Sequence, residues 1–134
     1  MREIYDYLTK CKTFYLATAE GDQPRVRPFG AVHIFEDKLY LITQKFKPVS
    51  KQIGANPKIE ICAVDGGAFD GSWLRVEATL VNDDRIEAKQ SMMDAIPVLK
   101  NIYKVDDDIT QVLYLKDATA TVATFAGEPK VIKF

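Results

Sequence analysis

The sequence lacks the residues on which histidine triads, multi-histidine metal sites and membrane spans depend, and each absence excludes a class of function. It contains a single histidine, His33, so neither a histidine-based triad with a second base nor a multi-histidine metal site can be built. Its apolar runs are too short to span a membrane, and the N-terminus lacks the apolar core of a signal peptide. We therefore expect a cytoplasmic protein without a membrane partner.

A strong net charge and a CxxC pair of cysteines are also missing. The 18 basic and 19 acidic residues leave a formal net charge of -1, and no basic run compensates. Nucleic acid is therefore not an expected partner, and any anion recognition has to be local. Cys11 and Cys62 form no CxxC pair and have apolar neighbours, so we predict two buried, reduced structural thiols.

Length and periodicity predict one mainly β domain over residues 1–134. Hydrophobic residues make up 47% and charged residues 28%, as in ordinary globular proteins. Six or seven strands with little intervening helix favour a closed antiparallel barrel with a few peripheral α-helices. We expect strands at 14–19, 25–35, 38–43, 58–64, 73–81, 110–115 and 118–125, with helices at 2–11, 47–55 and 85–95. Pro97 is expected to start or break a further short helix. Asp83 and Asp84 are predicted to cap the third helix.

The most informative stretch indicates an anion-binding corner. Arg27 lies on one predicted strand, Thr43 and Gln44 end the next, and Lys47 and Lys51 enter a helix. Guanidinium, hydroxyl, amide and ammonium groups are the donors that a phosphate monoester on a flat cofactor needs. For Arg25, a position on a solvated charged face is as plausible as a role in binding.

Two other features have simpler interpretations. His33 sits in a strand context that explains it without a chemical role. Asp106, Asp107 and Asp108 suggest a cation site, but no glycine-bearing calcium-loop pattern surrounds them. We interpret the three aspartates as a solvated turn or helix cap.

Several segments together resemble the pyridoxamine 5'-phosphate oxidase-like superfamily of FMN-binding split barrels, and most of all its small nitroimidazole-reductase-like members. The resemblance rests on Phe-Tyr-Leu-Ala-Thr at 14–18, Gly-Asp-Gln-Pro-Arg-Val-Arg-Pro-Phe-Gly at 21–30, the strand ending in Thr43, Asn-Pro-Lys-Ile-Glu-Ile at 56–61 and Trp-Leu-Arg-Val-Glu at 73–77. It implies a split β-barrel homodimer with FMN at the interface. The basic and aromatic C-terminal segment of true vitamin B6 oxidases is not found, so that activity is not expected.

The resemblance also implies which residues hold the cofactor. The strand that runs along FMN in the family matches Arg27, Pro28, Phe29 and Gly30. The positions that contact the ring or the ribityl chain match Ile42 and Thr43, with Gln44 beside them. The positions of the phosphate ligands match Lys47, Ser50 and Lys51. Trp73 matches a position that reaches the flavin of the partner subunit, although a core or interface tryptophan is an equal alternative.

The function predicted from these matches is electron transfer from a reduced nicotinamide or other donor to a small organic acceptor by bound FMN. No protein acid or base is predicted as catalytic, because the flavin carries the redox chemistry. The alternatives are a protein that binds flavin, haem or a deazaflavin without turnover, and a structural dimer that has lost its ligand.

Overall fold

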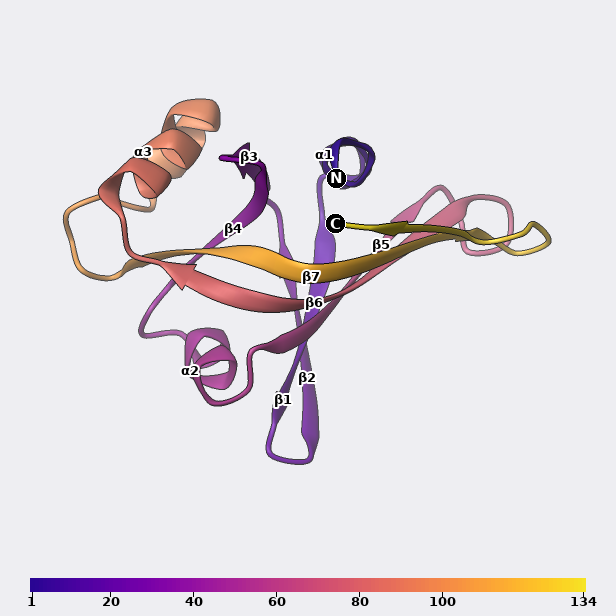
Figure 1. Ribbon diagram of the computed structural model, residues 1–134, viewed down its shortest axis with the longest axis horizontal. Helices are drawn as coiled ribbons and strands as arrows, with labels where there is room; N and C mark the ends of the chain where they lie inside the picture. The colour runs from indigo at the N-terminus through magenta and orange to yellow at the C-terminus, as the bar shows by residue number, and fades with distance from the viewer.

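The computed structural model describes residues 1–134, and it is built from eight strands, three α-helices and one 3₁₀ helix (Figure 1). In chain order these are α1 (Arg2–Cys11), β1 (Phe14–Glu20), β2 (Gln23–Phe29), β3 (His33–Phe35), β4 (Lys38–Gln44), α2 (Pro48–Ala55), β5 (Lys58–Asp65), β6 (Ser72–Asp83), α3 (Ile86–Ala95), η1 (Pro97–Asn101), β7 (Thr110–Thr124) and β8 (Lys130–Lys133). None of the helices is long and apolar enough to cross a membrane.

All strands belong to one antiparallel sheet in the order β2-β1-β5-β6-β7-β4-β3, with β8 paired to β7. The two strands at the ends of this order, β2 and β3, are neighbours in sequence, and only residues 30–32 connect them. The sheet must therefore curl until its two ends approach each other, which gives an incompletely closed barrel. The predicted mainly β, antiparallel split-barrel fold is confirmed, with eight strands instead of six or seven.

Alternation along the strands explains the core. In β6, Leu74, Val76, Ala78 and Leu80 are buried whereas Arg75 and Glu77 are exposed, as expected for a strand with one face toward the interior. The main core of 20 buried residues fills the curled sheet and includes Ile4 and Leu8 of α1. A second cluster joins α3 and η1 to β4 and β7 through residues that include Met92, Leu99 and Val112.

The predicted strand over residues 25–35 was wrong, because the chain breaks there into two strands. β2 ends at Phe29 and β3 begins at His33 on the opposite end of the sheet. Pro24 and Pro28 have no backbone N–H to donate, and an edge strand such as β2 is where proline is tolerated. Residues 30–32 then leave the edge of β2 and lead directly to β3, at the facing edge of the curled sheet.

The predicted pair of strands at 110–115 and 118–125 was also wrong, because both belong to the single strand β7. Asp117 has a φ of 53°, and the register with β6 shifts between Glu77 and Thr79. Asp117 and Ala118 therefore lie opposite the single residue Ala78 as a β-bulge inside one long strand, and residues 116–117 form no hairpin turn. The bulge lets β7 follow the curved sheet and pair with β6, β4 and β8.

The two cysteines are free, but the prediction that they are buried was wrong. Cys62 is exposed and Cys11 is half-buried. Cys62 alternates with the buried residues Ile61 and Ala63, so its side chain points to the outer face of β5. Apolar neighbours in sequence do not imply burial in a strand, since adjacent residues lie on opposite faces.

The predicted helix cap was wrong as well. α3 begins after Arg85 without a side-chain capping hydrogen bond, and Asp83 is the last residue of β6. The Asp83 carboxylate accepts a hydrogen bond from the Tyr40 hydroxyl at 2.7 Å and two from the Arg85 guanidinium. Arg85 also binds Glu36, so this cluster ties the start of α3 to β4 and to the turn before it.

The ionisation of Asp83 should make the stability of the fold depend on pH. Hydrogen bonds from Arg85 and Tyr40 lower the pKa of Asp83 from 3.8 to about 2. A lowered folded-state pKa stabilises the fold above the unfolded value, and this stabilisation is lost as pH falls from about 4 toward 2. We expect it to contribute at most about 2 kcal/mol at neutral pH, because Arg85 is half exposed.

Urea unfolding at pH 6 and pH 3 measures this contribution. The free energy of unfolding should fall less between the two pH values in Asp83→Asn than in the wild type. Asp22→Asn, at an exposed turn, serves as the control and should behave like the wild type. Equal pH dependence in all three proteins would contradict the role assigned to Asp83.

Candidate functional site

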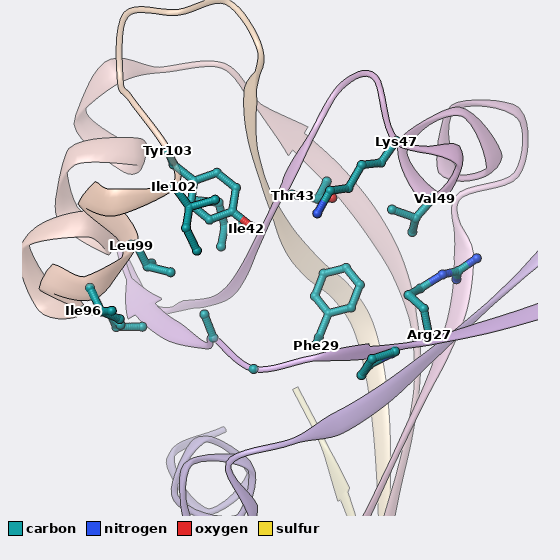
Figure 2. Close-up of a pocket in the computed structure, with 14 residues that line it drawn as sticks. Arg27, Phe29, Ile42, Thr43, Lys47, Val49, Ile96, Leu99, Ile102 and Tyr103 are labelled. Atoms are coloured by element: carbon teal, nitrogen blue, oxygen red, sulfur yellow. The ribbon is translucent and has the colours of Figure 1, made fainter.

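A cavity of about 310 Å³ lies where the curled sheet almost closes (Figure 2). Its walls come from the end of β2 and the crossing segment after it, the end of β4, the start of α2, and the segment from the end of α3 through η1. Predicted site residues in the lining are Arg27, Pro28, Phe29, Gly30, Ile42, Thr43 and Lys47. The fold therefore brings the two predicted strand motifs and the first lysine of α2 together around one space.

Arg27 is the most tightly held residue of this site. Its Nη1 donates to the backbone carbonyl of Leu16 at 3.0 Å and to the Thr18 hydroxyl at 2.9 Å. Its Nη2 donates to Oε1 of Gln52 at 2.6 Å, and the Thr18 hydroxyl donates to the same Gln52 oxygen at 2.6 Å. Thr18 and Gln52 are both buried, so the end of the guanidinium is fixed between β1 and α2.

The acceptors on Arg27 leave part of the guanidinium free. Thr18 accepts a hydrogen bond from Nη1 and Gln52 accepts one from Nη2, and these two acceptors are hydrogen-bonded to each other. Nε and the second N–H of Nη2 have no protein acceptor. An arginine carries five N–H donors, and two on one edge can bind two oxygens of a phosphate or carboxylate. All three groups that hold Arg27 are uncharged, so its positive charge is not neutralised by this clasp.

The end of the cavity that contains Arg27 is cationic. Arg27 and Lys47 are the only charged residues in the lining, and no acidic residue lines the space. Burial lowers the pKa of Arg27, with a smaller contribution from Arg25, but an arginine stays charged at neutral pH. Figure 2 shows the Lys47 side chain extending across the cavity in the direction of Thr43. α2 begins just after Lys47, and a helix N-terminus adds partial positive charge.

Phe29 and Thr43 occupy the middle of the cavity in Figure 2. Thr43 is 2% exposed, and its hydroxyl has no hydrogen-bond partner in the protein. Because no fully buried side-chain polar atom lacks a partner, this hydroxyl must be open to the cavity. It offers a ligand one donor and one acceptor beside the aromatic ring of Phe29.

The other end of the cavity is apolar. The residues that line it come from β4, the end of α3 and η1 with the residues after it, namely Ile42, Ile96, Val98, Leu99, Ile102 and Tyr103. The second core cluster anchors this wall, because Leu99 and Ile42 are both buried in it. The cavity thus joins a cationic end to an uncharged one, which suits a ligand with an anionic group at one end and a flat, weakly polar body.

Three predicted site residues, Gln44, Ser50 and Lys51, do not line this cavity. Gln44 pairs with Thr110 in the sheet, and the Ser50 hydroxyl donates to Gln111 at 2.6 Å. Lys51 is exposed on another face of α2, although it was predicted to act with Lys47. Successive residues of an α-helix are rotated by about 100° about its axis, so Lys51 lies on the opposite face from the buried Val49, Gln52 and Ile53.

Trp73, Arg25 and His33 also lie outside the lining. Trp73 is half-buried on β6 between Val64 and Ala123, so its predicted contact with a cofactor requires a second subunit. Arg25 forms an exposed ion pair with Glu20 at 3.0 Å. His33 Nε2 lies 2.8 Å from the Ser91 hydroxyl, which connects β3 to α3, and burial lowers its pKa.

The aspartates at 106–108 form a turn, in agreement with one of the two interpretations of the sequence. Asp107 accepts hydrogen bonds from the backbone N–H groups of Ile109 and Thr110 and from the Thr110 hydroxyl. Thr110 is fully buried and in turn accepts from the backbone N–H of Lys104. Asp107 thereby fixes the loop that follows the apolar wall of the cavity.

Sequence reasoning missed the apolar wall and the clasp on Arg27. Ile96, Leu99 and Tyr103 lie far from the other site residues in sequence, and nothing in their local pattern relates them to β2. Gln52 did carry a signal, because it shares the apolar face of α2 with Val49 and Ile53. A glutamine on a buried helix face needs polar partners, and those partners turn out to be Thr18 and Arg27.

Comparisons with known proteins agree on one family. A sequence profile described as pyridoxamine 5'-phosphate oxidase matches residues 1–123. No curated protein sequence matches the chain. Among solved structures, a NimC/NimA family protein from Clostridium acetobutylicum is 44% identical with a TM-score of 0.94, and the match covers 100% of this chain and 92% of that one.

Two more distant structures share the fold alone. A putative pyridoxamine 5'-phosphate oxidase from Listeria innocua is 15% identical with a TM-score of 0.67, over 99% of this chain and 96% of that one. A heme binding protein from Mycobacterium smegmatis is 13% identical with a TM-score of 0.73, over 95% of this chain and 55% of that one. Proteins that share this fold are therefore named for different ligands or substrates.

The clasp on Arg27 predicts a loss of stability when Gln52 is replaced. Gln52→Leu keeps the size of the side chain but leaves the Thr18 hydroxyl and one N–H of Arg27 without an acceptor. We expect the free energy of unfolding to fall by about 1–3 kcal/mol, the usual cost of unsatisfied buried polar groups. The neighbouring exposed change Lys51→Leu should alter it by less than about 0.5 kcal/mol. Chemical denaturation that finds Gln52→Leu as stable as Lys51→Leu would refute the clasp.

Proposed function

The chain belongs to the pyridoxamine 5'-phosphate oxidase family, and on that premise we propose that it is an FMN-binding flavoprotein that transfers electrons between a small donor and a small organic acceptor. The observation that carries the proposal is the cationic end of the cavity, where Arg27 and Lys47 face no acidic residue. Two cations without a counter-ion in a partly buried site favour a bound dianion, and the phosphate of FMN is one.

The donor set of the cavity fits FMN in the proposed arrangement. The free edge of Arg27 and the Lys47 ammonium would hold the phosphate, and the N-terminus of α2 adds to the positive potential there. The Thr43 hydroxyl would bind a polar atom farther along the cofactor, and Phe29 and Ile42 would contact its apolar parts. When bound, the flavin would supply the redox chemistry, and these residues would position it and exclude water.

We propose that the functional unit is a homodimer. The outer face of β1, β5 and β6 carries Tyr15, 50% exposed, Val64, 44% exposed, and the half-buried Trp73. Pro28 lines the cavity and is paired with Tyr15 of this face, so a second subunit covering the face would reach the edge of the cavity. In this arrangement Trp73 of each subunit approaches the cofactor held by the other.

Binding without turnover is the competing function. The same cavity would serve a protein that only stores or senses flavin, and a related fold is described as heme binding in Mycobacterium smegmatis. Rapid mixing of the FMN-loaded protein with NADH or NADPH separates the two: bleaching of the flavin followed by acceptor-dependent reoxidation supports an oxidoreductase. We do not extend the proposal to vitamin B6 oxidation, because Arg27 and Lys47 are the only cations in the cavity and a second phosphate would have none.

Titration with FMN and riboflavin tests the phosphate site. FMN should bind the wild type much more tightly than riboflavin, which lacks the phosphate. Lys47→Ala should weaken FMN about tenfold, as expected for loss of one charged hydrogen bond of about 1.5 kcal/mol, and should leave riboflavin unchanged. Lys51→Ala removes the same charge from the same helix outside the cavity and should bind FMN like the wild type. Equal affinity for FMN and riboflavin in the wild type would overturn the assignment.

Sedimentation velocity tests the dimer. The wild type should sediment as a dimer at micromolar concentration, and Trp73→Glu should be monomeric because it places a charge in the covered face. Ile86→Glu, at a position 56% exposed at the start of α3, serves as the control and should remain dimeric. A monomeric wild type that retains FMN tightly would contradict the proposed interface.

A further inference from the structure

Glu20 lies behind the clasp on Arg27, at the end of β1 that leads into the turn to β2. One of its carboxylate oxygens accepts two hydrogen bonds from the Arg25 guanidinium, at 3.2 and 3.0 Å. The other oxygen accepts a hydrogen bond from Nε2 of Gln52 at 3.4 Å. Because Oε1 of Gln52 accepts from Arg27, the Gln52 amide stands between a carboxylate and the guanidinium of the site.

The chemistry of its two neighbours allows the Gln52 amide only one orientation. An arginine has donors and no acceptor, so the amide atom that meets Arg27 must be the oxygen. An ionised carboxylate has acceptors and no donor, so the amide atom that meets Glu20 must be the nitrogen. A flipped amide would place two donors against each other at Arg27 and two acceptors against each other at Glu20. The contact with Glu20 therefore favours the same orientation that the clasp requires.

Glu20 is held in the ionised form that this contact needs. Hydrogen bonds from Arg25, the positive charge of Arg25 and the hydrogen bond from Gln52 all lower the pKa of Glu20. Glu20 is paired with Gln23 in the hairpin of β1 and β2, and α2 packs against β1, so the backbone keeps the carboxylate near Gln52. The Glu20 side chain is 53% exposed and Gln52 is 6% exposed, so the network leads from the surface to the buried clasp.

The Gln52 amide also keeps the carboxylate of Glu20 away from Arg27. Glu20 is bonded to Arg25 and Gln52, and it forms no hydrogen bond or ion pair with Arg27. A carboxylate in direct contact with Arg27 would neutralise the guanidinium and occupy the donors that an anionic ligand needs. Through a neutral amide, Glu20 can order the guanidinium and leave both its charge and its free edge available.

We propose that Glu20 is a positioning residue for the anion site, which fixes the orientation of the Gln52 amide and thereby holds the free edge of Arg27 toward the phosphate of the ligand. This inference rests on the proposed function, which places the phosphate of FMN at Arg27 and Lys47. It extends the site to a residue that does not line the cavity and that acts through Gln52 without contacting the ligand.

Removal of the Glu20 side chain separates this role from a simple electrostatic effect, because the two effects have opposite signs. A negative charge near an anion site weakens the binding of an anion, so loss of the charge alone would strengthen FMN binding. Loss of positioning instead leaves the Gln52 amide free to turn and the Arg27 guanidinium less ordered, which weakens FMN binding. Riboflavin has no phosphate, and its affinity should not respond to the order of Arg27.

Titration with FMN and riboflavin measures this sign in the wild type and three variants. Glu20→Ala should weaken FMN binding about 2- to 10-fold, the usual effect of one hydrogen bond, and leave riboflavin unchanged. Glu20→Gln keeps an oxygen that can accept from Gln52 and should restore most of the FMN affinity. Asp22→Ala removes the same charge from the adjacent exposed turn and should match the wild type. An FMN affinity in Glu20→Ala equal to or above that of the wild type would overturn the proposal.

NMR of the ligand-free protein distinguishes failure of this inference from failure of the proposed function. A wild type that binds FMN no more tightly than riboflavin would refute the phosphate site. The role of Glu20 is then decided by the signals of the Arg27 Nε–H and the Gln52 side-chain amide, which should shift in Glu20→Ala and stay unchanged in Asp22→Ala. Signals that are the same in Glu20→Ala and the wild type would overturn the role of Glu20, whatever the protein binds.

Discussion

The clasp on the Arg27 guanidinium is the interaction on which the rest of the site depends. An arginine beside a partly apolar cavity usually finds a carboxylate, which neutralises it. Here a backbone carbonyl, the Thr18 hydroxyl and the Gln52 amide oxygen hold it with uncharged acceptors. The guanidinium is therefore ordered before a ligand arrives and still carries its full charge, so little reorganisation is needed to bind an anion.

The fold makes this clasp available by curling one sheet until its ends approach each other. β2, β1 and α2 supply the arginine and its acceptors, whereas β4, α3 and η1 supply the opposite wall. Because residues 30–32 cross directly from β2 to β3, the cavity lies at the seam of the barrel. A cationic wall and an apolar wall thus meet across a space that neither half of the sheet would form alone.

The sequence predicted the local parts of this arrangement better than the long-range ones. Periodicity identified α1, β4, α2 and β6, and the resemblance to a known family placed Arg27, Phe29, Thr43 and Lys47 in one site, where the structure also brings them together. Lys51 does not line this cavity, because it lies on the face of α2 opposite to the buried Val49, Gln52 and Ile53. Gln52 is the residue of α2 that contacts Arg27.

Features that depend on tertiary contact were not visible in the sequence. Asp83 was predicted to cap a helix, but at the end of β6 its carboxylate accepts hydrogen bonds from Tyr40 and Arg85. Tyr103 follows a short 3₁₀ helix with no motif around it, and only packing of Leu99 against β4 and β7 brings it to the cavity. Such residues become recognisable once the register of the sheet is known.

A crystal structure of the FMN complex tests the central claim most directly. The account predicts phosphate oxygens within hydrogen-bond distance of Nε and Nη2 of Arg27 and of the Lys47 ammonium, with the bonds to Leu16, Thr18 and Gln52 still in place. A phosphate bound elsewhere, with the free edge of Arg27 still facing only solvent, would contradict it.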